Sequence, residues 1–210
     1  MFLSSNLFWR IPALLIAITF HEYAHGKAAQ LQGDPTAQYS GRLTLNPLAH
    51  LDPIGLLMLW IVGFGWAKPV PINPRNFNDY YKGILKVALA GPLTNLFIAF
   101  LSIILLRVIG PFWPAFFFPL FSNLMVYNIF LAVFNIIPLP PLDGSKVLVA
   151  LLPPSSRHYY YNIEPYGPFI LILLLAFGLL PAILLPISQA IYAVFLRIID
   201  FIILIGGVIS

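Results

Sequence analysis

The chain has 210 residues, of which 60% are hydrophobic and only 9% are charged, and it contains no cysteine. This composition excludes an ordinary soluble domain, disulfide bonds and cysteine-based zinc sites. The net charge of +4 is small and scattered, so we expect no nucleic-acid partner. We predict an all-α polytopic protein of the lipid bilayer with about five to six transmembrane helices.

Five segments have the length and the apolar character of membrane-spanning helices. At 1.5 Å per residue, these segments of 18–25 residues span about 27–38 Å, which is comparable to a hydrocarbon core of about 30 Å. The five predicted segments are residues 7–31, 83–107, 115–138, 167–184 and 187–207. Prolines break helices, so we place the boundary between the last two segments at Pro181 and Pro186.

The predicted helix 7–31 contains the most informative pattern of the chain. His21 and His25 are four residues apart, so on a helix their imidazole rings share one face and can bind one metal ion. Glu22 lies beside them, where a carboxylate can polarise a metal-bound water. Ionisable side chains inside an apolar helix are costly and are candidates for function. The alternative is a pair of interfacial histidines with a glutamate partner at a helix end.

Two segments between the first two of these helices are not long helices. Residues 53–66 are apolar and glycine-rich but short for a membrane span, so a re-entrant or interfacial segment is expected. Residues 39–45 alternate weakly between polar and apolar side chains, which favours an edge strand. The predicted fold therefore combines a three-helix catalytic core with a short β or re-entrant segment.

A zinc ion that is bound by two histidines needs at least one more protein ligand and an open position for water. Asp143 is favoured because it follows prolines at the end of the helix 115–138, and broken backbone at membrane depth lines a cavity or is buried in protein. Gly144 permits a tight turn beside it, although an Asp-Gly surface turn is an equal alternative. The other candidates are Asp34, His50, Asp52, Glu164 and Asp200.

Three motifs together resemble the site-2 protease family, the intramembrane zinc metallopeptidases. The motifs are His21-Glu22-Tyr23-Ala24-His25-Gly26, Gly91-Pro92-Leu93-Thr94-Asn95, and the stretch from Asn135 to Leu142-Asp143-Gly144. They occur in the order of the family and together span residues 20–144. No PDZ or CBS domain is recognisable, so the resemblance implies a minimal form of the family.

The resemblance also implies a role for each motif residue. The implied ligands of one zinc ion per chain are His21, His25 and Asp143. Glu22 corresponds to the general base of the family. Asn95 and Asn135 match asparagines that hold the substrate strand or the oxyanion in the family.

The membrane topology constrains this site independently. His25 lies near the end of the first predicted helix, and Asp143 lies just beyond the end of the helix 115–138. Both ends can meet only on one side of the membrane, which requires that residues 53–66 do not cross it. Lys and Arg are concentrated in the two segments that flank the site. The positive-inside rule then places the site toward the cytoplasmic side of the plasma membrane and the N-terminus outside.

Other ionisable residues have simpler interpretations. His50 lies in a proline-rich loop, where a structural or substrate-contact role is favoured over a ligand role, because a fourth protein ligand would close the water position. Arg197 and Asp200 are three residues apart on the last helix and are predicted to pair with each other. His158 and the three tyrosines after it are typical of an interfacial aromatic belt.

We therefore predict a zinc-dependent endopeptidase that cleaves transmembrane or membrane-proximal segments of membrane proteins. The chain is expected to be one integral-membrane domain over residues 1–210, with a catalytic core at about 7–146 and a helix pair at about 166–208. The alternative function is a transporter or channel with an intramembrane metal or proton site, although the chain shows no duplicated half. A third alternative is a membrane scaffold that has lost its catalytic activity. Such a protein is expected to have a damaged histidine–glutamate motif, whereas the motif of this chain is intact.

Overall fold

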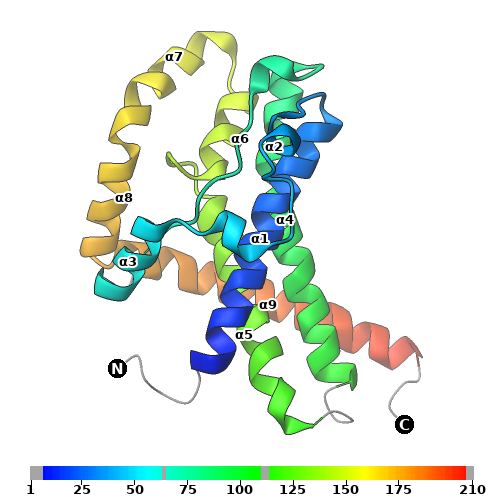
Figure 1. Cartoon of the computed structure of the whole chain (residues 1–210). Helices are drawn as coiled ribbons and strands as arrows, with labels where there is room; N and C mark the ends of the chain where they lie inside the picture. Colours follow the sequence, from blue (N-terminus) through cyan, green and yellow to red (C-terminus); the bar gives the residue numbers. More distant parts are fainter. Residues whose placement is uncertain (1–6, 63–64, 110–113, 207–210) are drawn as a thin grey trace.

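The computed structural model of the protein describes residues 7–62, 65–109 and 114–206 (Figure 1). The longer described helices are α1 (Leu7–Leu31), α3 (Pro53–Val62), α4 (Tyr80–Ile104), α5 (Phe118–Asn135), α6 (Asp143–Leu151), α7 (Pro154–Ile163), α8 (Gly167–Ala176) and α9 (Leu179–Gly206). The shorter ones are α2 (Thr36–Tyr39), the 3-10 helices η1 (Pro47–His50), η2 (Pro74–Asn76), η5 (Ala115–Phe117) and η6 (Glu164–Tyr166), and the π-helical turn η3 (Leu105–Ile109). The predicted all-α class is therefore confirmed for this part of the chain.

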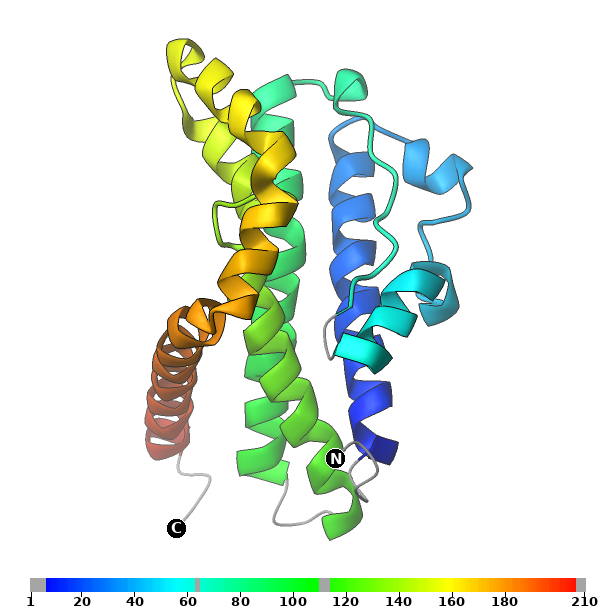
Figure 2. The ribbon, with the colours of Figure 1, turned by 90° about the vertical axis from the view of Figure 1, so that its left-hand side faces the viewer.

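The centre of the molecule is a bundle in which α1, α4 and α5 pack against one another along their lengths (Figure 2). Small side chains line these contacts. Each of five alanines in the three helices is at most 2% exposed: Ala13, Ala17, Ala88, Ala99 and Ala132. In an apolar solvent, small residues stabilise helix pairs because they let the two backbones approach closely.

Three described helical segments are long and apolar enough to cross a membrane. They are Tyr80–Val108, Ala115–Asn135 and Leu179–Ile205. The first two agree with the predicted spans 83–107 and 115–138, and the helix predicted at 7–31 is α1 with the same bounds. The predicted total of five to six spans is not confirmed. Figure 1 shows α9 running across α4 and α5 rather than along them.

The predicted boundary between the last two helices is wrong. α8 has 10 residues and ends before Gly178, whose φ of 67° places it in the left-handed region. Glycine adopts this conformation without a steric penalty, so it ends helices readily. Pro181 lies in the first turn of α9, where no intrahelical partner is needed for a backbone N–H, and the 28-residue helix also continues through Pro186.

The segment around α3 leaves the bundle and returns to its starting point. Leu51 and Ala67 form an antiparallel bridge, and the Lys68 N–H donates to the His50 carbonyl at 2.9 Å. The Asp52 carboxylate caps α3 by accepting the N–H groups of its first turn at 2.9 and 2.8 Å. Residues 63 and 64 lie outside the described residues, and the re-entrant or interfacial position of 53–66 in the membrane stays a prediction.

The predicted edge strand at 39–45 is wrong. Tyr39 ends α2, and the residues that follow form turns and bends. The N–H groups of Arg42 and Leu43 donate back to the Ala37 carbonyl at 2.8 and 3.2 Å, so they cannot form a ladder with a second strand.

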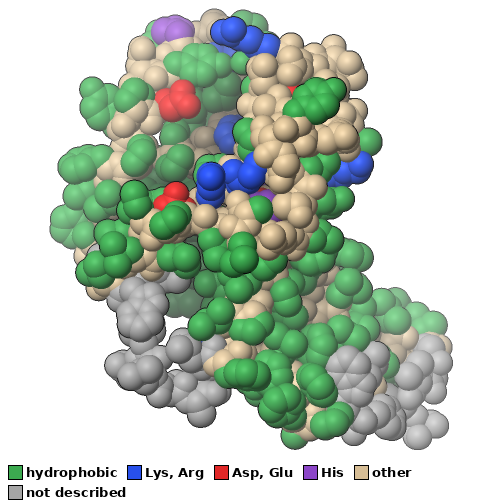
Figure 3. All heavy atoms as spheres, viewed as in Figure 1, with side chains coloured by type: hydrophobic (Ala, Val, Ile, Leu, Met, Phe, Trp, Pro, Cys, Tyr) green, Lys and Arg blue, Asp and Glu red, His purple; other side chains and the backbone are tan. Residues whose placement is uncertain are grey.

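Charged side chains are unevenly distributed over the face that Figure 3 shows. Lys, Arg, Asp and Glu lie on the upper half, over the region of α2, α6 and α7, and the lower half is hydrophobic. The polar end of the bundle is thus the end at which α1 finishes and α4 begins.

Candidate metal centre

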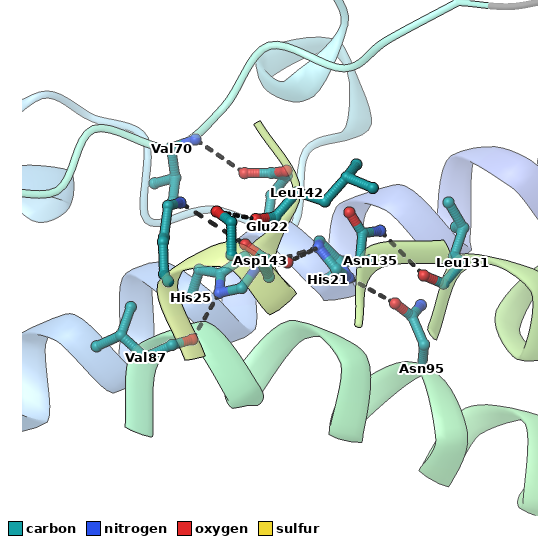
Figure 4. A network of polar contacts seen from close by, with 12 residues as sticks. His21, Glu22, His25, Val70, Val87, Asn95, Leu131, Asn135, Leu142 and Asp143 are labelled. Atoms are coloured by element: carbon teal, nitrogen blue, oxygen red, sulfur yellow. Dashed lines mark hydrogen bonds and ion pairs between the residues drawn. The ribbon is translucent and has the colours of Figure 1, made fainter. Parts of the chain in front are cut away.

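Three buried side chains from two distant parts of the chain converge inside the bundle (Figure 4). α1 contributes His21 and His25, and the first residue of α6 is Asp143. The Nε2 atoms of the two histidines are 3.0 Å apart. Asp143 Oδ2 lies 3.0 Å from His25 Nε2 and 3.2 Å from His21 Nε2. The ligand set predicted from the sequence is therefore assembled in space.

This group of atoms fits a zinc ion. The three candidate ligand atoms lie within 4.8 Å of one another, and each of the three residues is at most 7% exposed. Two donors that are bound to one tetrahedral zinc at 2.0–2.2 Å lie about 3.3–3.6 Å apart, a few tenths of an ångström more than the 3.0–3.2 Å found here. Imidazole and carboxylate are ordinary zinc ligands, so chemistry and spacing agree.

Both histidines use their other ring nitrogen for a hydrogen bond to the protein. The His25 Nδ1–H donates to the Val87 carbonyl of α4 at 2.7 Å. The His21 Nδ1–H donates to Asn95 Oδ1 at 2.5 Å. A hydrogen at Nδ1 leaves the lone pair of Nε2 free for a metal, and such partners fix the tautomer and the ring orientation of metal ligands.

Gly91 lets α4 pass directly behind the two rings. A Cβ atom at this position would lie 2.4 Å from His25 Nε2 and 2.6 Å from His21 Cε1. Only glycine leaves enough room for both imidazoles at this crossing point. This is the physical reason for glycine in the second motif.

Glu22 lies next to the centre and is held by the chain that returns from α3. Its Oε2 atom accepts the Val70 N–H at 2.8 Å. The same returning segment is fixed from outside by Arg42, whose Nη2 donates to the carbonyls of Lys68 and Pro69 at 2.8 and 3.2 Å. The half-buried Glu22 carboxylate therefore has a defined position at the edge of the site.

The two asparagines of the resemblance lie in different environments. Asn95 is fully buried, and besides accepting from His21 its Nδ2 donates to Ala17 O at 3.1 Å and Asn128 Oδ1 at 2.7 Å. Its polar atoms are thus turned to protein partners rather than toward a substrate. Asn135 is half-buried at the end of α5, with its Nδ2 donating to the Leu131 carbonyl at 3.0 Å.

The other candidate ligands lie apart from this group and have other partners. Asp34 is 0% exposed and joins the loops after α1 and before α4, because it accepts from Asn73 N at 2.7 Å and Asn76 Nδ2 at 2.8 Å. Burial alone would raise the pKa of the Asp34 carboxyl, but hydrogen bonds from Thr36, Asn73 and Asn76 outweigh it and hold the pKa below its ordinary value. Asp34 is therefore a structural residue in this fold.

The remaining candidate ligands also lie away from the metal centre: His50, Asp52, Glu164 and Asp200. His50 is fully buried and its Nε2 bonds to the Thr44 carbonyl at 2.8 Å, which agrees with the structural role favoured for it. Asp52 caps α3, and Glu164 is exposed at η6.

Asp200 forms an ion pair with Arg107 at 2.8 Å. The predicted pair of Arg197 with Asp200 is therefore wrong. The partner comes from η3, which the packing of α9 across α4 brings within reach.

Two side chains near the centre were not predicted from the sequence. Asn128 is 0% exposed and contacts Asn95. The sequence feature that could have identified Asn128 is an amide side chain in the middle of an apolar helix. Lys146 Nζ lies 3.7 Å from Asp143 Oδ1, one helical turn further along α6. An i, i+3 relation to a candidate ligand could have identified it.

Searches among known proteins find similar chains of one class. The chain is 39% identical over 187 residues to the candidate zinc metalloprotease YwhC of Bacillus subtilis. The matched residues cover 86% of this chain and 85% of YwhC. It is 31% identical over 174 residues to the candidate zinc metalloprotease Rip2 of Mycolicibacterium smegmatis. It is 26% identical over 200 residues to the zinc metalloprotease MJ0392 of Methanocaldococcus jannaschii. No family model and no solved structure matches the chain.

The chain covers 65% of Rip2 and 50% of MJ0392, so these two proteins are longer. All three relatives belong by name to the zinc metalloproteases, the class that two histidines and a glutamate on one helix also define. The similarity to YwhC extends over most of both chains. The chain belongs to the site-2 protease family of zinc metalloproteases, as the three motifs predicted, and its cofactor is zinc.

Proposed function

We propose that the chain is an intramembrane zinc endopeptidase of the site-2 protease type, which cleaves transmembrane or membrane-proximal segments of membrane proteins. The observation that carries the proposal is the convergence of three protein donors in a buried position between apolar helices, with no fourth donor in the group among the residues that the structure describes. A three-donor zinc site keeps a position for water or substrate and is the catalytic type, whereas four donors close the site. In this proposal residues 1–210 act as one domain, and its catalytic core is residues 7–146.

In the proposed site, the zinc ligands are His21, His25 and Asp143. Bound zinc supplies Lewis-acid chemistry, which polarises the scissile carbonyl and lowers the pKa of a water toward about 7. The negative carboxylate of Asp143 reduces the local positive charge, and the two Nδ1–H bonds keep both rings in orientation.

Glu22 acts as the general base. One of its oxygens accepts the Val70 N–H, and a carboxylate has further lone pairs that can take a proton. Glu22 removes a proton from the attacking water as the water oxygen bonds to the carbonyl carbon. It then passes this proton to the amide nitrogen as the carbon–nitrogen bond breaks, so the products are a carboxylic acid and an amine.

The position of the centre supports a membrane substrate. Two of the helices that surround it, α4 and α5, lie in segments that are suited to cross a bilayer. A transmembrane substrate hides its carbonyls in its own hydrogen bonds, so it must unwind locally before cleavage. Asn135, half-buried at the end of α5, is the proposed contact to the unwound substrate or to the oxyanion.

We propose a multi-pass protein of the plasma membrane with this site toward the cytoplasm and the N-terminus outside. The concentration of Lys and Arg on the polar end in Figure 3 supports this orientation by the positive-inside rule. The contacts of Asp34 with Asn73 and Asn76 support one shared side of the membrane for the segments before and after α3, because they join these segments at one end of the bundle.

Glu22→Gln tests the proposal, and Glu164→Gln is its matched control because these are the two glutamates of the chain. We expect Glu22→Gln to keep about one zinc per chain and to cleave membrane substrates about 10²–10⁴-fold more slowly. Glu164→Gln should retain both properties. The comparison of membrane proteomes from cells with either variant should show uncut substrates only with Glu22→Gln.

The alternative, a transporter or channel with a metal or proton site, gives a different result. A transporter keeps its transport activity in Glu22→Gln, and no membrane protein accumulates in uncut form. Cleavage by Glu22→Gln at the native rate would exclude the assigned base.

A further inference from the structure

A directed series of hydrogen bonds leads from α5 through α4 to His21. The Asn128 Nδ2 donates to the Leu124 carbonyl at 2.8 Å, and Asn128 Oδ1 accepts from Asn95 Nδ2 at 2.7 Å. Asn95 Oδ1 in turn accepts the His21 Nδ1–H at 2.5 Å. Both asparagines are 0% exposed, so water does not compete for these bonds.

The direction of this series is set by backbone carbonyls, which can only accept. The Leu124 carbonyl requires the NH₂ group of Asn128 to point toward it, so Oδ1 of Asn128 faces Asn95. The Ala17 carbonyl and Asn128 Oδ1 together require the NH₂ group of Asn95. Only Oδ1 of Asn95 then remains for His21, and an acceptor at this point requires the hydrogen on Nδ1 of the ring.

We propose that Asn128 is a positioning residue of the metal centre, which acts through Asn95 to keep His21 in the tautomer that presents its Nε2 lone pair to zinc. The inference rests on the proposed function only in taking His21 as a zinc ligand. Without the acceptor oxygen of Asn128, only the longer bond to the Ala17 carbonyl holds the NH₂ group of Asn95, so the amide rotates more easily and presents NH₂ to the ring. The ring then loses its acceptor at Nδ1, and the tautomer with a hydrogen on Nε2 cannot bind the metal through that atom.

The two histidines differ in this dependence. His25 reaches the Val87 carbonyl directly, so its tautomer needs no intermediate side chain. His21 depends instead on the amide of Asn95, whose NH₂ group is held by the Ala17 carbonyl at 3.1 Å and by Asn128 Oδ1 at 2.7 Å. A bond between Asn95 and Asn128 that merely joined α4 to α5 would affect stability, whereas a positioning bond affects zinc affinity.

The experiment compares zinc affinity, by competition with a chelator, and thermal stability of the purified full-length chain. We expect Asn128→Leu to bind zinc about tenfold more weakly, because loss of an outer partner costs 10–100-fold in metal affinity. Asn128→Asp should stay within about threefold of the native affinity, since a neutral buried acid can donate to Leu124 O and accept from Asn95. Asn123→Leu is the matched control, because Asn123 is on the same helix and donates to the Pro119 carbonyl.

A packing control and a double variant separate positioning from general damage. Ile129→Ala removes a side chain that is 4% exposed in α5, so it should lower stability and leave zinc affinity unchanged. The double variant that combines Asn95→Leu and Asn128→Leu should lose no more zinc affinity than Asn95→Leu alone. The reason is that Asn128 acts through Asn95.

Each outcome decides between the alternatives. Native zinc affinity in Asn128→Leu, or a loss in the double variant that equals the sum of both single losses, would overturn the positioning role. Zinc loss in Ile129→Ala as large as in Asn128→Leu would do the same. Absence of zinc from the native chain would instead overturn the proposed function on which the inference rests.

Discussion

Gly91 is the position in α4 where one added methyl group should have its largest effect on the metal centre. In Gly91→Ala the new Cβ would meet His25 Nε2 at 2.4 Å and His21 Cε1 at 2.6 Å. Ordinary contacts between such atoms begin at about 3.5 Å, so one or both rings must move by about 1 Å. Metal ligands are held to within about 0.2 Å, so a shift of this size is too large for the site.

We expect Gly91→Ala to bind zinc more than about tenfold more weakly and to cleave about 100-fold more slowly. The effect on folding should be smaller. Overpacking costs about 1–3 kcal/mol, whereas replacing glycine by alanine inside a helix returns up to about 1 kcal/mol. Zinc content by metal analysis and thermal unfolding of the same purified sample measure both quantities.

Gly83→Ala is the control for this prediction. It makes the same substitution in the same helix, with the new Cβ 2.5 Å from the Phe77 ring and about 12 Å along α4 from Gly91. It should destabilise the fold to a similar extent and keep its zinc. Native zinc affinity in Gly91→Ala, or equal zinc loss in both variants, would refute the argument that the glycine makes room for the ligands.

Three further predictions concern other parts of the molecule. Asp143→Asn keeps the shape of the side chain but not its charge, so metal analysis after chelator treatment should show a loss of affinity of about tenfold or more; native affinity would place the third ligand elsewhere. Asp34 has a lowered folded-state pKa, so its stabilisation is complete above the unfolded-state pKa of about 4 and disappears as the pH falls through the folded-state value. Asp34→Asn should therefore be less stable than the native chain by about 1–3 kcal/mol at pH 7, with a difference that shrinks in acid, and equal unfolding temperatures at pH 7 would contradict this. Cysteines introduced by Gln38→Cys and Asn78→Cys should react with an impermeant thiol reagent from the same side of the membrane, and labelling from opposite sides would mean that residues 53–66 cross it.

Local sequence signals predicted the elements whose cause is local. The first part of α1 is a mostly apolar stretch, and the predicted 7–31 coincides with Leu7–Leu31. The shared face of His21 and His25 follows from the period of the helix. Asp143 was singled out because prolines end the preceding helix, and this break is what lets the carboxylate turn into the bundle.

The features that were not predicted depend on how distant helices pack. Asp200 pairs with Arg107, 93 residues away, rather than with its neighbour on the helix. The contact of Asn95 with Asn128 likewise depends on the rotation of α5 against α4, which apolar sequence does not specify. The predicted boundary before α9 was wrong because a proline such as Pro181 is tolerated in the first turn of a helix. The preceding helix ends instead near Gly178, which is in the left-handed region.

The bridge between Leu51 and Ala67 has a consequence for how the chain can vary. Because the two ends of this excursion are pinned to each other, the metal ligands do not depend on the number of residues between them. Doubling the length of such a loop costs only about 0.6 kcal/mol in closure entropy. We therefore expect residues 53–62 to accept insertions, a reporter peptide or a different segment while the centre stays intact.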